Sequence, residues 1–173
     1  FWHNPNVNGI DSTQVWFFNK DLELLNYFTD SDKRGAENMI GFLPCTDDNF
    51  IGFKSVEKHS LTTEGIVKKF DPLGKIIWAS NIGGESKYPQ NYSLQKVRPT
   101  SDNGCVGIWN QTYEGINNDT FPEQPILFKL DSNGKLEWSH TFFSKRRKYF
   151  YSLFETFNGD IIGIGTSENP GKT

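Results

Sequence analysis

Apolar and β-branched residues along this chain gather in short runs, and polar turn residues separate the runs. The clearest example lies between Ile126 and Gly165, where Asn133-Gly134 and Asn158-Gly159 each interrupt an apolar run. Asn-Gly between apolar runs is the strongest short-range signal for a β-hairpin. We therefore expect two successive hairpins here, each with a turn whose two central residues both have φ > 0.

Both hairpin signals recur earlier in the chain. Asp71–Trp78 matches Asp131–Trp138 at an offset of 60, with Asp, Gly, Lys and Trp all kept, and Phe18–Leu25 is a decayed first copy at an offset of 52. The second signal occurs three times at offsets of 55, and its copies begin at Thr46, Ser101 and Thr156. Two markers that alternate in this way indicate that the chain is built from successive copies of one structural unit.

Each repeat carries about four short apolar runs, which we interpret as strands. The segment 22–29 also fits a helical face, and comparison with the later copies assigns it to a strand. The expected strands are 14–19, 22–29, 39–45, 50–57, 65–71, 75–82, 93–99, 105–113, 125–131, 135–143, 150–157 and 160–167. Repeats of four strands at this spacing are typical of β-propeller blades.

Composition supports an all-β fold. The 173 residues include 15 Phe, five Trp and six Tyr but only two Ala, and aromatic residues favour strands over helices. The net charge of −3 gives no basic excess of the kind that nucleic-acid binding requires. No apolar run approaches the roughly 20 residues of a transmembrane helix. Because the chain begins at Phe1 and carries no signal peptide, we expect a processed product or a piece of something longer.

The repeated motifs resemble a known family. The element Asp-x-x-Gly-Lys-x-x-Trp, at Asp71–Trp78 and Asp131–Trp138, resembles the turn and outer strand of blades in the PQQ-like (quinoprotein-type) β-propeller superfamily. The Asp-Asn-Gly-x-x-x-Gly element is similar to the inner hairpin of repeat propellers in secreted bacterial proteins, which often are cargo of the type 9 secretion route. The resemblance covers residues 14–167 and implies an extracellular, cell-surface or periplasmic location.

The expected organisation is a propeller segment of about three blade equivalents. Residues 1–13 form an N-terminal arm or the end of a preceding unit, and 168–173 form a tail or a link to further chain. Between them the repeats run over 14–57, 65–113 and 125–167. The blade phase of the family instead gives complete blades at 39–82 and 93–142, an outer half at 14–29 and an inner half at 150–167.

Three blade equivalents are fewer than the four to eight that usually close a propeller ring. Either the rest of the same polypeptide or a second chain completes the ring, and we favour the first. The open half blades predict that residues 1–173 do not fold stably as an isolated monomer.

The repeated polar and aromatic residues have two interpretations. Asp71, Gly74 and their copies at 131 and 134 fit a ligand-binding series, but they fit a turn better, because Asp bonds local N–H groups and Gly supplies φ > 0. Trp78 and Trp138 fit stacking on a sugar or cofactor, but recurrence at one blade position favours packing between blades.

A binding site is better sought among residues that do not repeat. Trp109 and Tyr113 lack counterparts in the other copies, so they are the candidate ligand contacts. We expect no catalytic, cofactor-binding or metal residue, since the sequence has no nucleophile or phosphate-loop motif. The three histidines and the acidic residues Asp30, Asp32, Asp47 and Asp48 lack metal-site spacing. The basic run at 145–148 is interpreted as a solvated loop.

Two cysteines, Cys45 and Cys105, allow one disulfide or none. They fall at nearby but non-identical positions in successive repeats, so we expect them in neighbouring blades. A disulfide needs Cα atoms within about 7 Å of each other. We therefore predict two buried free thiols that are not bonded to each other.

The resulting functional hypothesis is a non-catalytic propeller module of an exported or surface protein. It would bind a protein or glycan partner or act as a scaffold, and the central face of the propeller is the expected ligand site. The alternative is part of a propeller enzyme, either quinoprotein dehydrogenase-like or a lyase or hydrolase, whose site lies mostly outside this segment.

Overall fold

The computed structural model describes residues 3–4, 12–30, 41–59, 62–83, 92–111, 124–142 and 148–168, and every regular element within them is a strand. All twelve expected strands are present, with ends that differ by three residues at most, together with a two-residue strand near the N-terminus. The strands are β1 (His3–Asn4), β2 (Ser12–Phe18), β3 (Leu24–Asp30), β4 (Gly41–Pro44), β5 (Phe50–His59), β6 (Thr62–Phe70), β7 (Ile76–Ile82), β8 (Tyr92–Pro99), β9 (Cys105–Gln111), β10 (Gln124–Leu130), β11 (Leu136–Thr141), β12 (Lys148–Glu155) and β13 (Ile161–Ser167).

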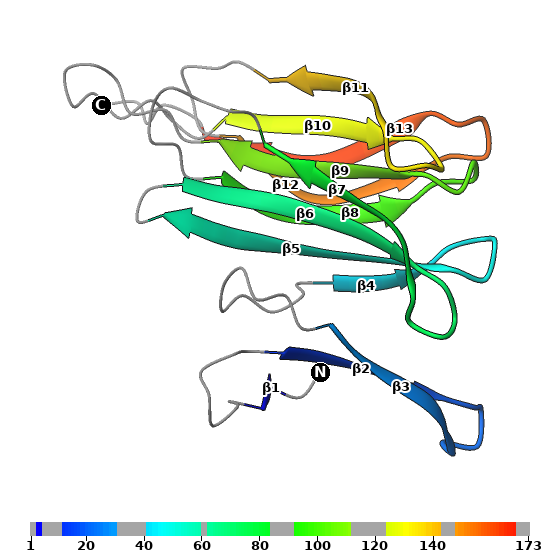
Figure 1. Cartoon of the computed structure of the whole chain (residues 1–173). Helices are drawn as coiled ribbons and strands as arrows, with labels where there is room; N and C mark the ends of the chain where they lie inside the picture. The colour runs from blue at the N-terminus through cyan, green and yellow to red at the C-terminus, as the bar shows by residue number, and fades with distance from the viewer. Residues whose placement is uncertain are drawn as a thin grey trace.

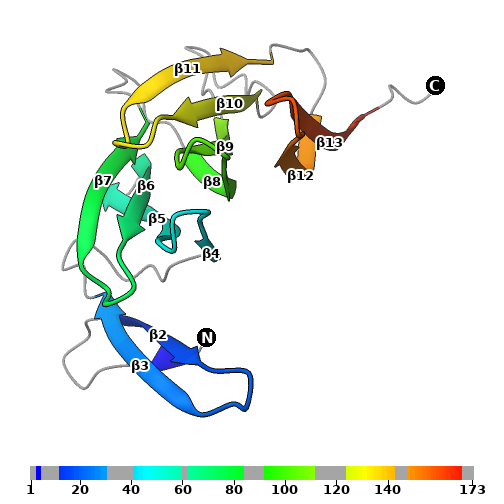
Figure 2. The same ribbon diagram turned by 90° about the vertical axis from the view of Figure 1, so that its right-hand side faces the viewer.

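The strands form two complete four-stranded antiparallel sheets and two partial ones. One complete sheet has the order β4-β5-β6-β7 and the other β8-β9-β10-β11, which is the grouping expected at 39–82 and 93–142. The partial sheets are β1-β2-β3 and β12-β13. The four sheets follow one another along an open arc, with β2 and β3 at one end and β12 and β13 at the other (Figure 1, Figure 2).

The last two strands of each complete sheet, β6–β7 and β10–β11, form its outer hairpin. Strand register confirms that these outer hairpins are repeats of each other. Trp78 of β7 lies opposite Lys69, and Trp138 of β11 lies opposite Lys129, so the two tryptophans are equivalent, as their sequence match predicts. Each hairpin has a register shift immediately after the lysine. The β2–β3 hairpin has the same shift after Phe17, so the decayed first copy is a third outer hairpin.

The turns differ from the expected type. Only the glycine of each Asn-Gly pair has positive φ, at 79° for Gly134 and 82° for Gly159, so the expectation of two positive values is wrong. In the first turn Asp131 N–H donates to Lys135 C=O at 2.9 Å, and Gly134 N–H donates to Asp131 C=O at 3.0 Å. This is a three-residue loop, in which a type I turn precedes one left-handed residue.

The inner hairpins are β4–β5, β8–β9 and β12–β13. Their backbone conformation corrects the offset expected between their turns. The left-handed residues of the three inner turns are Asp48, Asn103 and Gly159, with φ of 62°, 64° and 82°. The step from Asp48 to Asn103 equals the expected offset, but Gly159 lies one position later than that offset predicts. The uniform offset is therefore wrong by one position in the last copy.

The core lies between consecutive sheets rather than inside any one of them. The largest cluster joins the two complete sheets and consists of Ile51, Phe53, Val67, Ile82, Leu94, Val97, Cys105, Phe128 and Leu130. A smaller cluster joins β9 to β12 and consists of Val106, Ile108 and Leu153. Packed rings of Phe17, Phe28, Phe42, Phe50 and Phe70 join β2–β3 to the first complete sheet. Strands β5 and β6 bury side chains on both faces, and Lys54, Lys68 and Lys69 are buried there beside the apolar residues.

Candidate functional site

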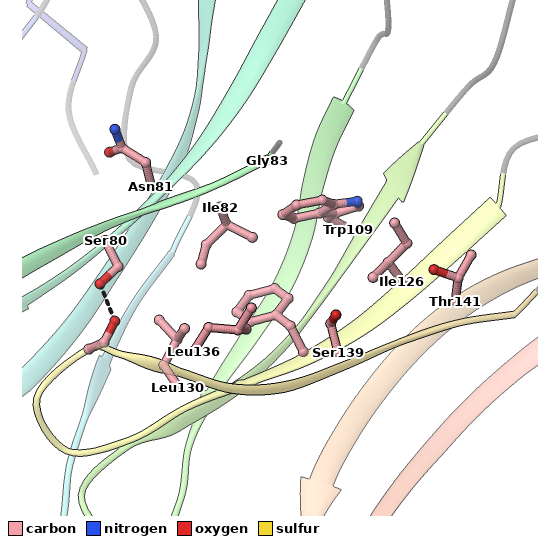
Figure 3. A pocket seen from close by; sticks show the side chains of 12 residues that line it. Ser80, Asn81, Ile82, Gly83, Trp109, Ile126, Leu130, Leu136, Ser139 and Thr141 are labelled. Atoms are coloured by element: carbon pink, nitrogen blue, oxygen red, sulfur yellow. Dashed lines mark hydrogen bonds between the residues drawn. The ribbon is translucent and has the colours of Figure 1, made fainter. Parts of the chain in front are cut away.

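A cavity of about 300 Å³ lies between the two complete sheets (Figure 3). Strand β7 forms one wall, and strands β9, β10 and β11 form the other. Its lining residues are Ser80, Asn81, Ile82, Gly83, Trp109, Ile126, Phe128, Leu130, Gly134, Leu136, Ser139 and Thr141. The inner strands β4 and β8 contribute none of them, so this cavity is not on the central face where we expected a ligand.

Trp109 is the largest side chain of the cavity wall. Strand β9 presents it toward β7, and its ring lies 6.1 Å from that of Phe128, which is fully buried beneath it. The indole edge reaches the backbone at Gly83, where an added Cβ would lie 4.0 Å from it. Tyr113, the other candidate ligand contact, lies outside the described residues. Trp109 therefore lines a cavity, and ligand contact by Trp109 and Tyr113 stays a prediction.

The cavity is apolar at its base and polar along its outer margin. Ile82 and Leu130 are buried below the opening, and Ser139 and Thr141 lie on β11 beside it. At one end Ser80 Oγ donates a hydrogen bond to the Gly134 carbonyl, which ties β7 to the turn of the next sheet. Such a cavity accepts a small apolar group with a few hydrogen bonds at its rim.

A repeated lysine–aspartate pair lies beneath two of the inner turns. Lys69 Nζ donates to Asp47 Oδ2 at 2.7 Å and to the Asn103 carbonyl at 2.9 Å. Lys129 Nζ, its counterpart in the next repeat, donates to Asp102 Oδ2 at 2.6 Å. Each pair fixes the turn of an inner hairpin to the first strand of the outer hairpin in the same sheet, β6 or β10. We therefore assign both pairs a structural role.

The Lys129–Asp102 pair shifts the pKa values of both of its groups. Burial alone raises the pKa of Asp102, but hydrogen bonds from Lys129, Thr100 and the Gly104 N–H outweigh it and lower that pKa to about 2. Burial likewise acts to lower the pKa of Lys129, and hydrogen bonds to Asp102 and Glu137 outweigh it and raise that pKa. Both groups therefore stay charged across the neutral range.

Two of the acidic residues considered as calcium ligands, Asp30 and Asp47, are paired with lysines. Asp30 lies 2.7 Å from Lys68 Nζ and 3.8 Å from Lys54 Nζ, and it anchors β3 to the first complete sheet. Asp47 is paired with Lys69, and Asp32 lies outside the described residues. Within the described ranges, no three His, Cys, Asp or Glu side chains gather as metal ligands would.

The repeated turn residues have the structural role that the sequence indicates. Asp71 Oδ1 accepts hydrogen bonds from the N–H groups of Leu73 and Lys75, both at 2.9 Å. Asp131 Oδ1 accepts the equivalent pair at 2.9 Å and 2.8 Å. The carboxylates are thus committed to their own turns.

The two repeated tryptophans differ in their surroundings. Trp78 packs on the outer turn of the next sheet, and its indole N–H donates to the Ser132 carbonyl at 2.8 Å, so packing between sheets is confirmed for it. Trp138 is 39% exposed, and no outer hairpin lies beyond it among the described residues.

Neither cysteine forms a disulfide. Cys105 is buried in the largest core cluster, and Cys45 is half-buried against that same cluster from the neighbouring sheet. Burial raises the pKa of Cys105 to about 12 and that of Cys45 to about 11. The prediction of two free thiols in neighbouring sheets is confirmed, although Cys45 is only partly buried.

Two of the remaining sequence candidates, His140 and Lys148, lie in the part of the chain that the structure describes. His140 is exposed and packs edge-on against Phe142 with ring centres 4.8 Å apart. Of the basic run, only Lys148 lies within the described residues, where it begins β12.

Sequence reasoning missed most of the cavity wall. Ser80, Ile82 and Gly83 carry no sequence signal, because the cavity exists only where two sheets meet. It also missed Lys69 and Lys129, whose signal was a lysine kept at the same place in two repeats, directly before an apolar residue and the Asp of the turn.

No protein-family model matches this chain, and a search of curated proteins finds no match. The resemblance to PQQ-like propellers therefore stays a prediction. Among the described residues, no helix has the length and hydropathy that crossing a membrane requires.

Proposed function

We propose that this chain is part of a non-catalytic, propeller-type binding module. One observation carries the proposal: the non-repeated Trp109 lines a cavity, whereas the repeated lysine–aspartate pairs are used to fix turns within their own sheets. Where the repeated polar groups have structural roles, we expect the specificity of binding to depend on the few residues that break the repeat. Among the described residues, no observation favours the alternative of a propeller enzyme.

In this proposal the four consecutive sheets are blades of a larger propeller ring. Their order along an open arc supports it, as do the repeated register shifts in the outer hairpins (Figure 2). The location outside the cytoplasm rests on the resemblance to secreted propellers. Fractionation of the source cells with an antibody to this chain tests that location, and a purely cytoplasmic signal would overturn it.

The proposed ligand is one protruding apolar or aromatic side chain of a partner protein. The cavity is at the lower limit of the roughly 300–1,000 Å³ that ligand sites occupy. Its apolar base suits a single side chain, and the rim hydroxyls of Ser139 and Thr141 suit the adjoining peptide group. Glycan is the other partner class, and stacking of a sugar face on Trp109 is its expected mode.

Titrations with small probes test this proposal. Acetylated amides of Phe, Trp and Leu, and a set of oligosaccharides, are added to protein labelled at its tryptophan indoles, and the Trp109 N–H resonance is followed by NMR. We expect the amino-acid amides to shift the Trp109 resonance. Trp109→Leu identifies that resonance, and we expect calorimetric titration of this variant with the amides to show loss of binding. Trp16→Leu is the matched control, because Trp16 is an exposed tryptophan that stacks on Tyr27 in the β2–β3 hairpin. A response to oligosaccharides alone would replace the protein partner by a glycan, and no response to either class would refute the site.

A further inference from the structure

The first two junctions between consecutive sheets follow one rule. An aromatic side chain of the last strand of one sheet packs on the outer turn of the next sheet, at a glycine. Phe28 of β3 packs in this way on Gly74, where an added Cβ would overlap its ring. Trp78 of β7 packs on Gly134, where an added Cβ would lie 2.6 Å from the indole. Real Cβ atoms do not approach other atoms so closely, so both junctions require glycine.

Trp138 is the counterpart of Trp78 in the next sheet, whereas Phe28 lies two positions further along its own strand, opposite Val15. Trp138 lies in β11 opposite Lys129, as Trp78 lies in β7 opposite Lys69. By the junction rule it should pack on the outer turn of the sheet that begins with β12 and β13. That sheet has no outer hairpin among the described residues, and Trp138 is 39% exposed.

The free edge of β13 indicates the same absent hairpin. Strands β12 and β13 correspond to the inner pairs β4–β5 and β8–β9, in which β5 pairs with β6 and β9 pairs with β10. Among the described strands, β13 pairs only with β12. Its side chains Ile162 and Ile164 are 42% and 53% exposed, and Phe157 in the adjoining turn is fully exposed. An open apolar edge of this kind is a site for strand addition.

We propose that β13 and Trp138 together bind one outer β-hairpin that carries a glycine-containing turn of the Asp-x-x-Gly type. The hairpin pairs antiparallel with β13, as β10 pairs with β9, where Cys105 lies opposite Leu130 and Val106 opposite Lys129. In the same register, the equivalents of Leu130 and Lys129 lie opposite Ile161 and Ile162. The turn of the bound hairpin then covers the Trp138 indole and accepts its N–H.

The β2–β3 hairpin of a second copy of this chain does not meet the requirement. Its turn has the same hydrogen bonds, from Asn19 N–H to Glu23 C=O and from Leu22 N–H to Asn19 C=O, but Leu22 stands where the other outer turns have glycine. Leu22 has φ of 63°, so its backbone matches Gly74 and Gly134, but its side chain would collide with an aromatic ring packed there as Phe28 and Trp78 pack on those glycines. The partner is therefore a hairpin other than β2–β3, with glycine at this position.

The inference rests on the sheet order of the proposed propeller, and it does not depend on what the Trp109 cavity binds.

The β10–β11 hairpin of this chain can serve as the probe for this site. A second copy of residues 124–142, which contains the β10–β11 hairpin and its glycine turn, is appended after Thr173, either directly or through a flexible linker as long as the 112–123 connection. We expect at least one of the two proteins to have a melting temperature about 5 °C or more above that of the unextended chain. We also expect hydrogen exchange of the Trp138 indole N–H to slow about tenfold or more. Trp138→Phe in the extended protein identifies that resonance.

Two matched extensions make the test specific. In one, the glycine of the appended turn is replaced by leucine; in the other, the appended segment is residues 12–30, with Leu22 in place. We expect neither to protect the Trp138 indole. Equal protection by residues 12–30 would make a second copy of this chain the occupant and overturn the proposal. Equal protection by the leucine variant would refute the glycine requirement, and no protection in any extension would refute a hairpin site. The Trp109 titrations are read separately, so failure here is distinguishable from failure of the proposed function.

Discussion

At the scale of single residues, the Lys129–Asp102 pair links stability to pH. The pKa of Asp102 is about 2 in the folded chain and about 3.8 in the unfolded chain. A carboxyl group whose pKa is lowered by folding stabilises the folded state above its unfolded pKa and loses that effect as the pH falls through the folded value. The pair should therefore contribute fully above about pH 5 and lose its contribution between about pH 5 and pH 2.

We predict that Asp102→Asn lowers the free energy of unfolding by about 1 kcal/mol or less at pH 7, because the carboxylate is half exposed and solvent screens it. Near pH 2 the variant and the original chain should be equally stable. Urea unfolding at several pH values measures this, and Asp160→Asn, at an exposed position in the third inner turn, is the control. A loss that is the same at pH 2 and pH 7 would show that Asp102 acts through packing and not through its charge.

The two thiols give a second residue-scale prediction. Their pKa values of about 11 and about 12 keep them protonated at pH 8, and only the thiolate reacts with disulfide reagents. In the folded chain we expect Cys105 to react far more slowly than an unfolded thiol and Cys45 to be intermediate. Ellman titration without reductant should find two free sulfhydryls after unfolding in guanidinium, and none would show that the disulfide forms.

Single residues were predictable from the sequence where their role is local. Asp131 and Gly134 serve a turn whose partners lie within four residues, so composition and spacing are sufficient. Trp109 could be singled out only because it breaks the repeat. Its cavity could not be predicted, because Ile82 and Ser80 reach it from a strand of another sheet.

At the scale of elements, the glycines of the turns separate backbone strain from packing. Gly134 and Gly159 have nearly equal positive φ, at 79° and 82°. A Cβ at Gly134 would collide with Trp78, whereas a Cβ at Gly159 would meet nothing within 4 Å. The two positions therefore form a matched pair for substitution.

We predict that Gly159→Ala costs about 1 kcal/mol, the usual penalty for a left-handed residue with a Cβ. Gly134→Ala should cost about 2–4 kcal/mol, because the contact with Trp78 adds overpacking to the same strain. Midpoints of urea unfolding measure both variants. Equal losses at the two positions would show that the junction with Trp78 adjusts without cost, and would weaken the glycine rule for the sheet junctions.

The strands were predictable because the sequence shows both short apolar runs separated by turn residues and the repetition of those runs. The segment 22–29 could be assigned to a strand only by comparison with the later copies, since its own pattern also fits a helix, and the structure has β3 at Leu24–Asp30. The turn type was not predictable from Asn133-Gly134 alone. The carboxylate of Asp131 bonds two N–H groups of its turn, and that favours a three-residue loop over the shorter one.

At the scale of the whole molecule, the sheets are held together by contacts that join distant parts of the chain. Leu94 N–H donates to Ser55 Oγ at 3.0 Å across the junction of the two complete sheets. Asp30 joins the first hairpin to Lys68 in the same way. The phase of the sheets was predicted by the family resemblance, but no pattern in the sequence foretells these pairings, because each residue of a pair belongs to a different repeat.

The last prediction concerns residues 1–173 as an isolated chain, which we expect to aggregate, to oligomerise or to melt at low temperature. Sheets in such an array are stabilised mainly by their neighbours, and here the first and last sheets each have a neighbour on one side only. Exposed apolar side chains gather in these terminal sheets, including Trp16, Leu25 and Tyr27 at one end and Tyr151, Phe154 and Ile164 at the other. Light scattering measures the oligomeric state of the isolated chain, and a thermal melt measures its melting temperature. A monomer that unfolds cooperatively above about 60 °C, the upper range for ordinary domains, would mean that the chain closes on itself as a small β-fold, because an open arc with two uncovered faces has no source for that stability.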